Sequence, residues 1–244
     1  MNLPHVTCVC PTADRQALTD RAVKCFLAQT YPNKSLLILD NGHVPYHWPV
    51  GIAGVSVVRS PLKRTIGEIR NLVNEWAAYS TIGSDADNII AHWDSDDWSH
   101  PLRLAWQVKQ LTVEGSDIQV VGYRSLLFWD SRPANNCAWM YEHESERYAV
   151  GTSLMYRWKT WKAKPFAERN RPGVPPEKDY AEDHEWIKGL RVLSVPGFFR
   201  GEPAMIAEIH GGNLCNNDWR FTNESANWRP APEWTERVRE RMKL

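Results

Sequence analysis

Short apolar runs alternate with amphipathic segments through the first half of the sequence. Four runs have the length of buried strands, at Val6–Cys10, Leu36–Leu39, Val55–Val58 and Asn88–Trp93. Apolar residues recur at helical spacing in Asp14–Thr30 and Glu68–Tyr79, and Pro101 is placed to open a further helix. Strands that alternate with amphipathic helices are typical of a parallel α/β sheet, and this is the fold class that we predict.

The second half has a less regular pattern with longer connections. Four more strands are predicted there, at Ile118–Gly122, Ser125–Trp129, Thr152–Tyr156 and Met205–Ile209. Helices are expected over Glu182–Leu190 and Glu233–Lys243. The segment Arg171–Glu177 holds three prolines and a glycine, which predicts a loop.

Length and composition fit one globular α/β domain. The 244 residues are 43% hydrophobic and 24% charged. The 29 basic and 29 acidic residues balance, so the chain has no overall attraction for nucleic acid or an anionic membrane. No apolar run reaches the roughly 18–20 residues that cross a bilayer, and Met1–Cys10 lacks the basic and apolar regions of a signal peptide.

Cysteine and tryptophan usage add two expectations. The five cysteines are odd in number and show no CxxC spacing, so we expect reduced core cysteines in a cytoplasmic protein. The thirteen tryptophans are in excess. Packing accounts for most of them, and a few in a cleft would offer flat platforms for a sugar ring.

Polar residues follow three of the predicted strands where each strand ends. These are Pro11-Thr12, Asp40-Asn41 and Asp94-Ser95-Asp96-Asp97. Ligands of open parallel sheets bind beyond the carboxyl ends of the strands. Three carboxylates within four residues repel one another and need water, a basic partner or a hard divalent cation such as Mg²⁺ or Mn²⁺. The alternative is a solvated acidic turn that caps the helix near Pro101, and the position beside the other polar strand ends favours the metal.

The order of these motifs resembles glycosyltransferase family 2, whose members have the GT-A fold, a Rossmann-like mixed sheet flanked by helices. The matching segments, in chain order, are Val6–Thr12 with Arg15, Gln29-Thr30-Tyr31-Pro32, Leu39-Asp40-Asn41-Gly42, Gly67 with Arg70 and Asn71, Asp94-Ser95-Asp96-Asp97 with Pro101, Glu182-Asp183, and His210-Gly211-Gly212-Asn213. Each motif alone is common, but their order and spacing together are specific. The sequence departs from the pattern at Ala13, Asp14 and Asn41, and it has no Arg or Lys near Glu208, two positions before the histidine.

The resemblance implies an inverting transferase that takes a sugar from a nucleotide-diphosphate donor, with UDP as the default nucleotide. It implies a divalent cation held by Asp96 and His210, with Asp94 at the metal or the ribose. Asp97 is expected to serve the metal's outer shell or the acceptor. Donor contacts are expected from a second set of residues, namely Pro11, Thr12, Arg15, Asp40, Arg70, Asp94 and Ser95.

Local chemistry leaves alternatives open for several of these residues. Asp40 before Asn-Gly is equally sound as a turn-forming aspartate. Arg70 would contact the donor or pair with a carboxylate such as Asp94, and His210 is a metal ligand or an ordinary loop histidine.

Asp183 is the candidate general base. An acceptor hydroxyl is a weak nucleophile, and a carboxylate within hydrogen-bond reach can take its proton. At a helix N-terminus that carboxylate stays ionised, although the same charge also serves simply to stabilise the helix. Glu182 and Glu185 compete for the role, and His184 is expected at the surface.

The predicted organisation is a catalytic domain over 1–215 and a polar, partly helical tail over 216–244. The catalytic domain divides into a nucleotide-binding half, 1–115, and an acceptor-side half, 116–215. A nucleotidyltransferase and a non-catalytic carbohydrate- or nucleotide-binding protein are the alternative functions. The acceptor stays open between a glycan, a lipid carrier, a small molecule, a protein and a modified DNA base. A basic stretch with two tryptophans, Trp158–Arg171, would suit an anionic acceptor or a solvated surface.

Overall fold

The computed structural model describes residues 3–48, 51–62, 64–80, 88–169, 173, 182–213 and 227–243. Its first half contains the alternation that the sequence predicts. The elements there are β1 (Val6–Thr12), α1 (Gln16–Leu27), β2 (Lys34–Asp40), β3 (Val55–Arg59), α2 (Ile66–Ser80), β4 (Ile89–His92), β5 (Trp98–Ser99) and α3 (Arg103–Leu111). The predicted loop at Arg171–Glu177 lies outside the described residues, apart from Gly173.

The second half is richer in strands than the sequence predicts. Its elements are β6 (Val120–Asp130), β7 (Cys137–Glu142), η2 (Gly151–Ser153), β8 (Met155–Arg157), α4 (Trp158–Ala163), α5 (Glu182–Ile187), β9 (Val192–Pro196), β10 (Phe198–Phe199), β11 (Glu202–Pro203), β12 (Met205–Ile209), β13 (Trp228–Pro230), η5 (Pro232–Trp234) and α6 (Thr235–Met242). The two strands expected between residues 118 and 129 are one long strand, β6. The strand expected at Thr152–Tyr156 begins as the 3₁₀ turn η2 and becomes extended only at Met155.

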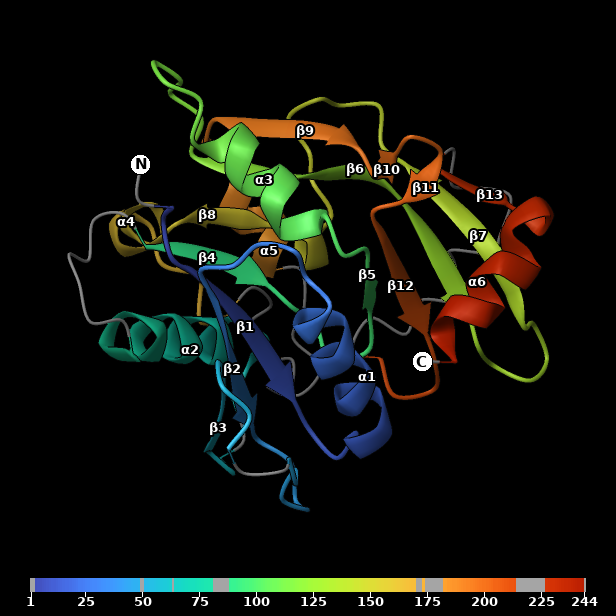
Figure 1. Ribbon diagram of the computed structural model, residues 1–244, viewed down its shortest axis with the longest axis horizontal. Helices are drawn as coiled ribbons and strands as arrows, with labels where there is room; N and C mark the ends of the chain where they lie inside the picture. Colours follow the sequence, from blue (N-terminus) through green and yellow to red (C-terminus); the bar gives the residue numbers. More distant parts are fainter. Residues whose placement is uncertain are drawn as a thin grey trace.

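Most of these strands form one mixed sheet with the order β13-β7-β6-β8-β4-β1-β2-β3 (Figure 1). β1 pairs in parallel with both β2 and β4, and β2 pairs in parallel with β3. β6 is long enough to pair with β8 and β9 through its first half and with β7 and β12 through its second. The predicted mixed α/β architecture in a single domain is confirmed.

Alternate residues of the central strands point into two cores on opposite faces of the sheet. On β1, Cys8 and Cys10 belong to one core and Val9 to the other. The first core is covered by α1, α3 and α6, and the second by α2, α4 and α5. Burial on both faces explains why these strands read as continuous apolar runs. Cys8, Cys10 and Cys25 are buried free thiols in the core, whereas Cys137 is only half-buried. Cys215 lies outside the described residues.

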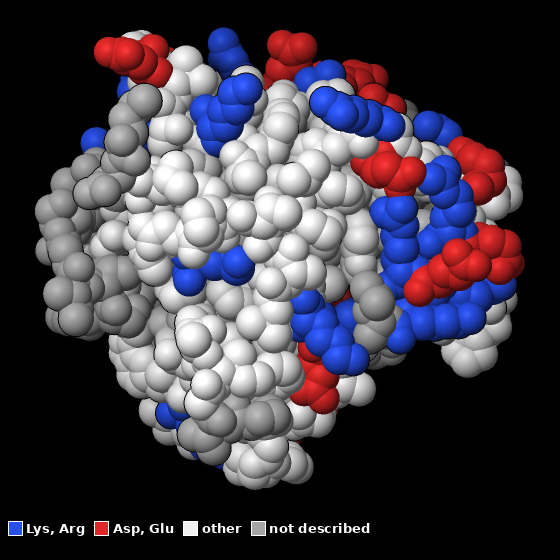
Figure 2. Space-filling view, in the orientation of Figure 1, with Lys and Arg blue, Asp and Glu red and all other residues white. Residues whose placement is uncertain are grey.

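The C-terminal elements pack on the first core, to which Ala231, Val238 and Met242 belong. β13 pairs antiparallel with β7, and the arginines of α6 stack on tryptophan rings, with Arg241 4.9 Å from the Trp98 centroid and Arg237 4.8 Å from that of Trp234. Basic and acidic side chains are interspersed over this end of the molecule (Figure 2). The division into 1–215 and 216–244 stays a prediction. Within the described residues, no helix combines the length and the apolar character that a bilayer crossing requires.

Candidate functional site

The polar strand ends meet at one edge of the sheet. Thr12 and Asp40 are partners in the parallel register of β1 and β2. β4 ends beside β1 at His92, and the Asp94–Asp97 turn follows directly. Segments that are far apart in the sequence therefore supply adjacent side chains at the carboxyl ends of parallel strands.

Asp96 is the centre of a polar cluster at this edge. Its Oδ2 accepts hydrogen bonds from Arg15 Nη1 at 3.0 Å, from His210 Nε2 at 3.1 Å and from Asn213 Nδ2 at 3.3 Å. Arg15 also donates to the backbone oxygen of Gly212. Burial acts to raise the pKa of Asp96, but the hydrogen bond from His210 and the charge of Arg15 outweigh it and lower the pKa. Asp96 is therefore an ionised carboxylate that brings three predicted segments together.

The Asp96–His210 pair has the chemistry of a divalent cation site. An imidazole nitrogen and a carboxylate oxygen lie side by side, and both are ligands of Mn²⁺. No group of three or more His, Cys, Asp or Glu side chains in the described ranges is arranged to hold a metal ion. Two protein ligands suffice where phosphates and water complete the coordination. The residues therefore fit a cation that is bound together with a diphosphate.

The hydrogen bonds of the His210 ring determine what must change before a cation can bind there. The Gly212 N–H donates to His210 Nδ1 at 3.0 Å, so in this arrangement the ring proton is on Nε2 and points to Asp96. A cation at Nε2 requires the proton to move to Nδ1. Binding would also replace the contact between Arg15 and Asp96.

Arg70 links the acidic turn to the start of α5. Its Nη2 donates to Asp94 Oδ1 at 2.9 Å and its Nε to Glu182 Oε1 at 3.3 Å. Arg70 thus pairs with Asp94, one of the two alternatives open from the sequence. Arg70 Nη1 and Ser95 Oγ are buried and lack a hydrogen-bond partner among the described residues. Unsatisfied buried donors beside Asp94 are costly in the empty protein, which favours a polar ligand at this place.

Asp183 lies in the first turn of α5, next to Glu182. Burial raises its pKa, and the nearby charge of Asp94 acts in the same direction, whereas the His184 N–H and Arg70 oppose the shift. Its Oδ1 accepts the His184 N–H at 2.8 Å. Glu182 is buried, and desolvation together with Asp183 raises its pKa to about 7 against the effect of Arg70. The predicted base therefore belongs to the same electrostatic cluster as the acidic turn, and its predicted competitor Glu182 is held by Arg70.

Gly151 packs directly against Asp183. A Cβ at residue 151 would overlap Asp183 Oδ2 and Cγ and lie 2.8 Å from the Asp183 Cβ. Only glycine leaves room for the carboxylate in this position. Sequence reasoning did not identify Gly151, because the two residues are 32 positions apart and no local pattern marks the contact.

Buried side chains hold η2, the turn that contains Gly151, at three successive carbonyls. His92 Nδ1 lies 2.8 Å from the oxygen of Gly151, Arg103 Nη2 3.0 Å from that of Thr152, and Gln107 Nε2 2.7 Å from that of Ser153. The Thr152 hydroxyl in addition donates to Asp97 Oδ2. η2 therefore connects the acidic turn to Asp183 through a fixed piece of backbone.

The Asp97 carboxylate accepts hydrogen bonds from two other segments of the fold. Besides Thr152, the Glu208 N–H donates to its Oδ1 at 3.2 Å. Burial, followed by the charges of Asp96 and Asp94, raises its pKa. These contacts join β12 and η2 to the acidic turn.

His92 anchors η2 in the core and yields a stability prediction. Its Nε2 lies 3.1 Å from the Tyr156 hydroxyl, and burial lowers its pKa, so the ring is neutral. His92→Leu removes one hydrogen bond from each partner, although the Gly151 oxygen still accepts the Leu154 N–H at 3.2 Å and the Tyr156 hydroxyl still accepts from Asn74 at 2.9 Å. We expect a loss of about 1–3 kcal/mol for the two hydrogen bonds together. His92→Asn retains a donor near the Nδ1 position and should lose less. Urea unfolding of both variants measures the difference, and equal stability would contradict the anchoring role.

Three more residues were predicted to contact the nucleotide-sugar donor, and two of them have hydrogen-bond partners nearby in the chain. Asp40 accepts the N–H groups of Gly42 and Tyr46, both at 2.9 Å, as the turn-forming alternative predicts. The Thr12 hydroxyl lies 2.7 Å from the Thr19 hydroxyl. Pro11 is the half-buried residue before Thr12 in β1. All three lie at the same sheet edge, so a role at the donor stays a prediction.

Arg21 supplies a positive charge that the histidine motif lacks. It forms a buried ion pair with Glu208, and its Nη2 also donates to the backbone oxygen of Asp96. Its Nη1 donates to the oxygen of Met242 at 3.1 Å, which ties the end of α6 to this region. Sequence reasoning noted that no basic residue lies near Glu208, but it did not identify the cation on α1.

Comparison with known proteins identifies the fold. No protein-family model matches the sequence, and a search of curated proteins finds no match. Among solved structures, S. aureus TarS 1–349 in complex with UDP-GlcNAc has a TM-score of 0.56 and 13% identity over 87% of this chain. The mannosyltransferase PcManGT from Pyrobaculum calidifontis, in complex with GDP-Man and Mn²⁺, has a TM-score of 0.52 and 14% identity over 90% of this chain. The fold is GT-A-like. The present chain spans 61% of the length of each of these two chains.

Proposed function

We propose that the protein is an inverting glycosyltransferase of the hexosyltransferase type, which moves a sugar from a nucleotide-diphosphate donor to an acceptor hydroxyl. One observation carries the proposal. In a GT-A-like fold, carboxylates from the acidic turn and from α5 gather around Arg70, beside the Asp96–His210 pair. The similar solved structures contain a nucleotide sugar, UDP-GlcNAc in one and GDP-Man in the other. UDP is the nucleotide that the family resemblance implies.

Residue roles follow from the contacts. Asp96 and His210, with Asp94 nearby, would hold Mn²⁺ or Mg²⁺, which neutralises the diphosphate leaving group when bound. Arg15, released from Asp96, would then contact the diphosphate. Arg70 Nη1 and Ser95 Oγ, which have no hydrogen-bond partner among the described residues, would contact the ribose and diphosphate. Thr12 and Asp40 would contact the base and ribose. Asp183 accepts the proton of the attacking hydroxyl.

Release of nucleoside diphosphate tests the proposal. The protein is incubated with a panel of UDP-, GDP- and other nucleotide sugars, with Mn²⁺ or Mg²⁺, and the free diphosphate is measured. At least one donor should be hydrolysed slowly in the absence of an acceptor. If no nucleotide sugar binds or reacts, while nucleoside triphosphates release pyrophosphate, the protein is a nucleotidyltransferase.

Asp96→Asn is expected to weaken metal-dependent nucleotide binding about tenfold or more, because a neutral amide is a poor ligand for a hard cation. Calorimetric titration of UDP is compared with and without Mn²⁺. In the wild type the metal should strengthen binding, and in the variant this gain should disappear. Glu75→Gln, an exposed change on α2, serves as the control. Equal metal enhancement in wild type and Asp96→Asn would reject the ligand assignment.

A further inference from the structure

The end of α6 lies beside the acidic turn Asp94–Asp97, although the two segments are far apart in the sequence. β5 follows the turn directly and pairs antiparallel with β12, the strand that leads to His210. Figure 1 shows the end of α6 close to these two strands. Two separate contacts join this end of the helix to the turn and the residue after it, one through Arg241 and the other through Arg21.

The first contact is the stacking of the Arg241 guanidinium on the Trp98 ring. The carbon Cζ lies 4.9 Å from the ring centroid, and Trp98 is the residue that follows Asp97. A guanidinium over an indole face is attracted by the ring quadrupole, and the attraction is stronger where water is excluded. Trp98 is buried, and the Arg241 side chain is only 26% exposed because Glu202 also pairs with it. The stacking therefore holds the residue after the turn against α6.

The second contact runs through the guanidinium of Arg21 on α1. Its Nη1 donates to the backbone oxygen of Met242 at 3.1 Å, and its Nη2 donates to the backbone oxygen of Asp96 and to the Glu208 carboxylate. The last carbonyls of a helix have no partners within the helix and carry partial negative charge, so a cation is favourable there. One guanidinium therefore joins the end of α6, the acidic turn and β12.

Both contacts limit how the backbone of the turn can move. Arg21 holds the carbonyl of Asp96, and Arg241 holds the ring two positions later in the chain. A cation at the Asp96 carboxylate would replace the ion pair with Arg15, but it would leave these two contacts in place. They therefore determine where the carboxylate lies after its own side-chain partner has changed.

We propose that α6 positions the acidic turn for cation binding, with Arg241 and Arg21 as positioning residues for Asp96. The inference rests on the proposed transferase function, because it gives a helix outside the predicted nucleotide-binding half a role at the donor site. Residues that orient a metal ligand without touching the metal typically change metal affinity by about 10–100-fold when they are substituted. The role of α6 is thus measurable as a change in metal-dependent nucleotide binding.

Arg241→Gln and Arg237→Gln form a matched pair of variants. Arg237 also stacks on a tryptophan, with its Cζ 4.8 Å from the Trp234 centroid, and it also pairs with Glu202. Each substitution therefore removes one stacking contact and one ion pair with the same glutamate. Only Arg241→Gln releases Trp98, because Trp234 belongs to η5 and not to the acidic turn or β5.

Calorimetric titration of UDP with and without Mn²⁺ gives the gain in affinity that the metal provides. Arg241→Gln should lower this gain about fivefold, the size expected for a partly buried stacking contact. Arg237→Gln should leave the gain unchanged. The affinity for UDP without metal should be the same in both variants, and urea unfolding should show comparable losses of stability.

Arg21 provides a graded test of the same role. Arg21→Gln removes the charge that joins Asp96 to Met242, whereas Arg21→Lys retains the charge but lacks the planar fork that reaches several acceptors at once. The metal-dependent gain should fall about tenfold or more in Arg21→Gln and less in Arg21→Lys. If Arg21→Gln does not fold, the matched pair on α6 still decides the question.

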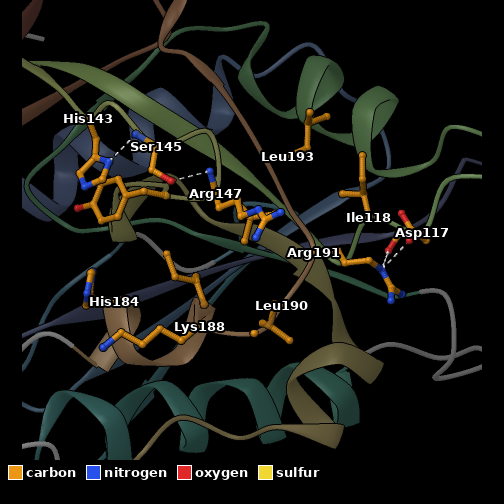
Figure 3. A pocket seen from close by; sticks show the side chains of 14 residues that line it. Asp117, Ile118, His143, Ser145, Arg147, His184, Lys188, Leu190, Arg191 and Leu193 are labelled. Carbon is orange, nitrogen blue, oxygen red and sulfur yellow. Dashed lines mark hydrogen bonds and ion pairs between the residues drawn. The ribbon is translucent and has the colours of Figure 1, made fainter.

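Arg191→Gln controls for the loss of one positive charge. Arg191 Nε lies 3.0 Å from Asp117 Oδ2 at the cavity shown in Figure 3, to which neither α6 nor the acidic turn contributes a residue. The metal-dependent gain should be unchanged in this variant.

The outcomes separate this inference from the transferase proposal. A metal-dependent gain that is equal in Arg241→Gln and Arg237→Gln overturns the role of α6 and leaves the transferase proposal standing. A gain that falls equally in Arg191→Gln shows that net charge, and not position, is responsible, and this also overturns it. If UDP does not bind to the wild-type protein, the transferase proposal is refuted and the inference falls with it.

Discussion

Asp183→Asn is expected to abolish sugar transfer while nucleotide binding stays intact. The amide is isosteric but cannot accept the proton of the acceptor hydroxyl, and loss of a general base costs about 10²–10⁴-fold in rate. Among the described residues, no hydrogen bond joins Asp183 to Asp94 or Arg70, and its Oδ1 accepts the His184 N–H. The donor region should therefore keep its geometry. Two quantities are measured for the variant and the wild type: kcat for sugar transfer, and the Kd for UDP in the presence of Mn²⁺.

A control variant and a pH profile sharpen this prediction. Glu185→Gln removes an exposed carboxylate of the same helix, paired with Lys188, and should leave the rate unchanged. Because burial raises the pKa of Asp183, the ionised base is lost as pH falls through a value above the ordinary 3.8. The acid limb belongs to the Asp183–Glu182 pair jointly. Transfer by Asp183→Asn at a rate near that of the wild type would remove Asp183 from the mechanism.

The sequence was most informative where burial on both faces imposes a continuous apolar pattern. β1, β2 and β4 are recovered within a few residues because both cores need their side chains. The failures lie in the second half. β7 and β13 have mostly partly exposed positions, so no clear apolar run marks them. β6 reads as two strands because Tyr123 and Arg124 interrupt the pattern, although the backbone pairs across them with an irregularity in register.

The candidate site shows the same division between local and distant information. The strand-end motifs are visible in the sequence, and the sheet brings them together because parallel strands end at one edge. The side chains that hold them in place are not visible. His92, Arg21 and Gly151 act through partners 59, 187 and 32 positions away, and single-sequence patterns carry no information on such contacts. The metal role of Asp96 and His210 stays a prediction, because a bound diphosphate would have to supply further ligands to the cation.

Gly151→Ala is expected to lower transfer about a hundredfold, because a displacement of roughly 1 Å at a catalytic group has an effect of that size. The added methyl overlaps the Asp183 carboxylate, and the backbone of residue 151 cannot retreat because His92 and the neighbouring η2 contacts hold it. The carboxylate must therefore move. The Kd for UDP with Mn²⁺ should change little, since the three atoms nearest to the added methyl all belong to Asp183, which is not assigned to the donor.

A double-mutant cycle separates displacement of the base from general damage to the fold. Overpacking at residue 151 should destabilise the protein by about 1–3 kcal/mol, measured by urea unfolding. In the Asp183→Ala background the overlapped carboxylate is gone and only the 2.8 Å approach to Cβ remains, so the added cost of Gly151→Ala should be smaller. Equal cost in both backgrounds, or transfer at the wild-type rate by Gly151→Ala, would show that this glycine does not set the position of Asp183.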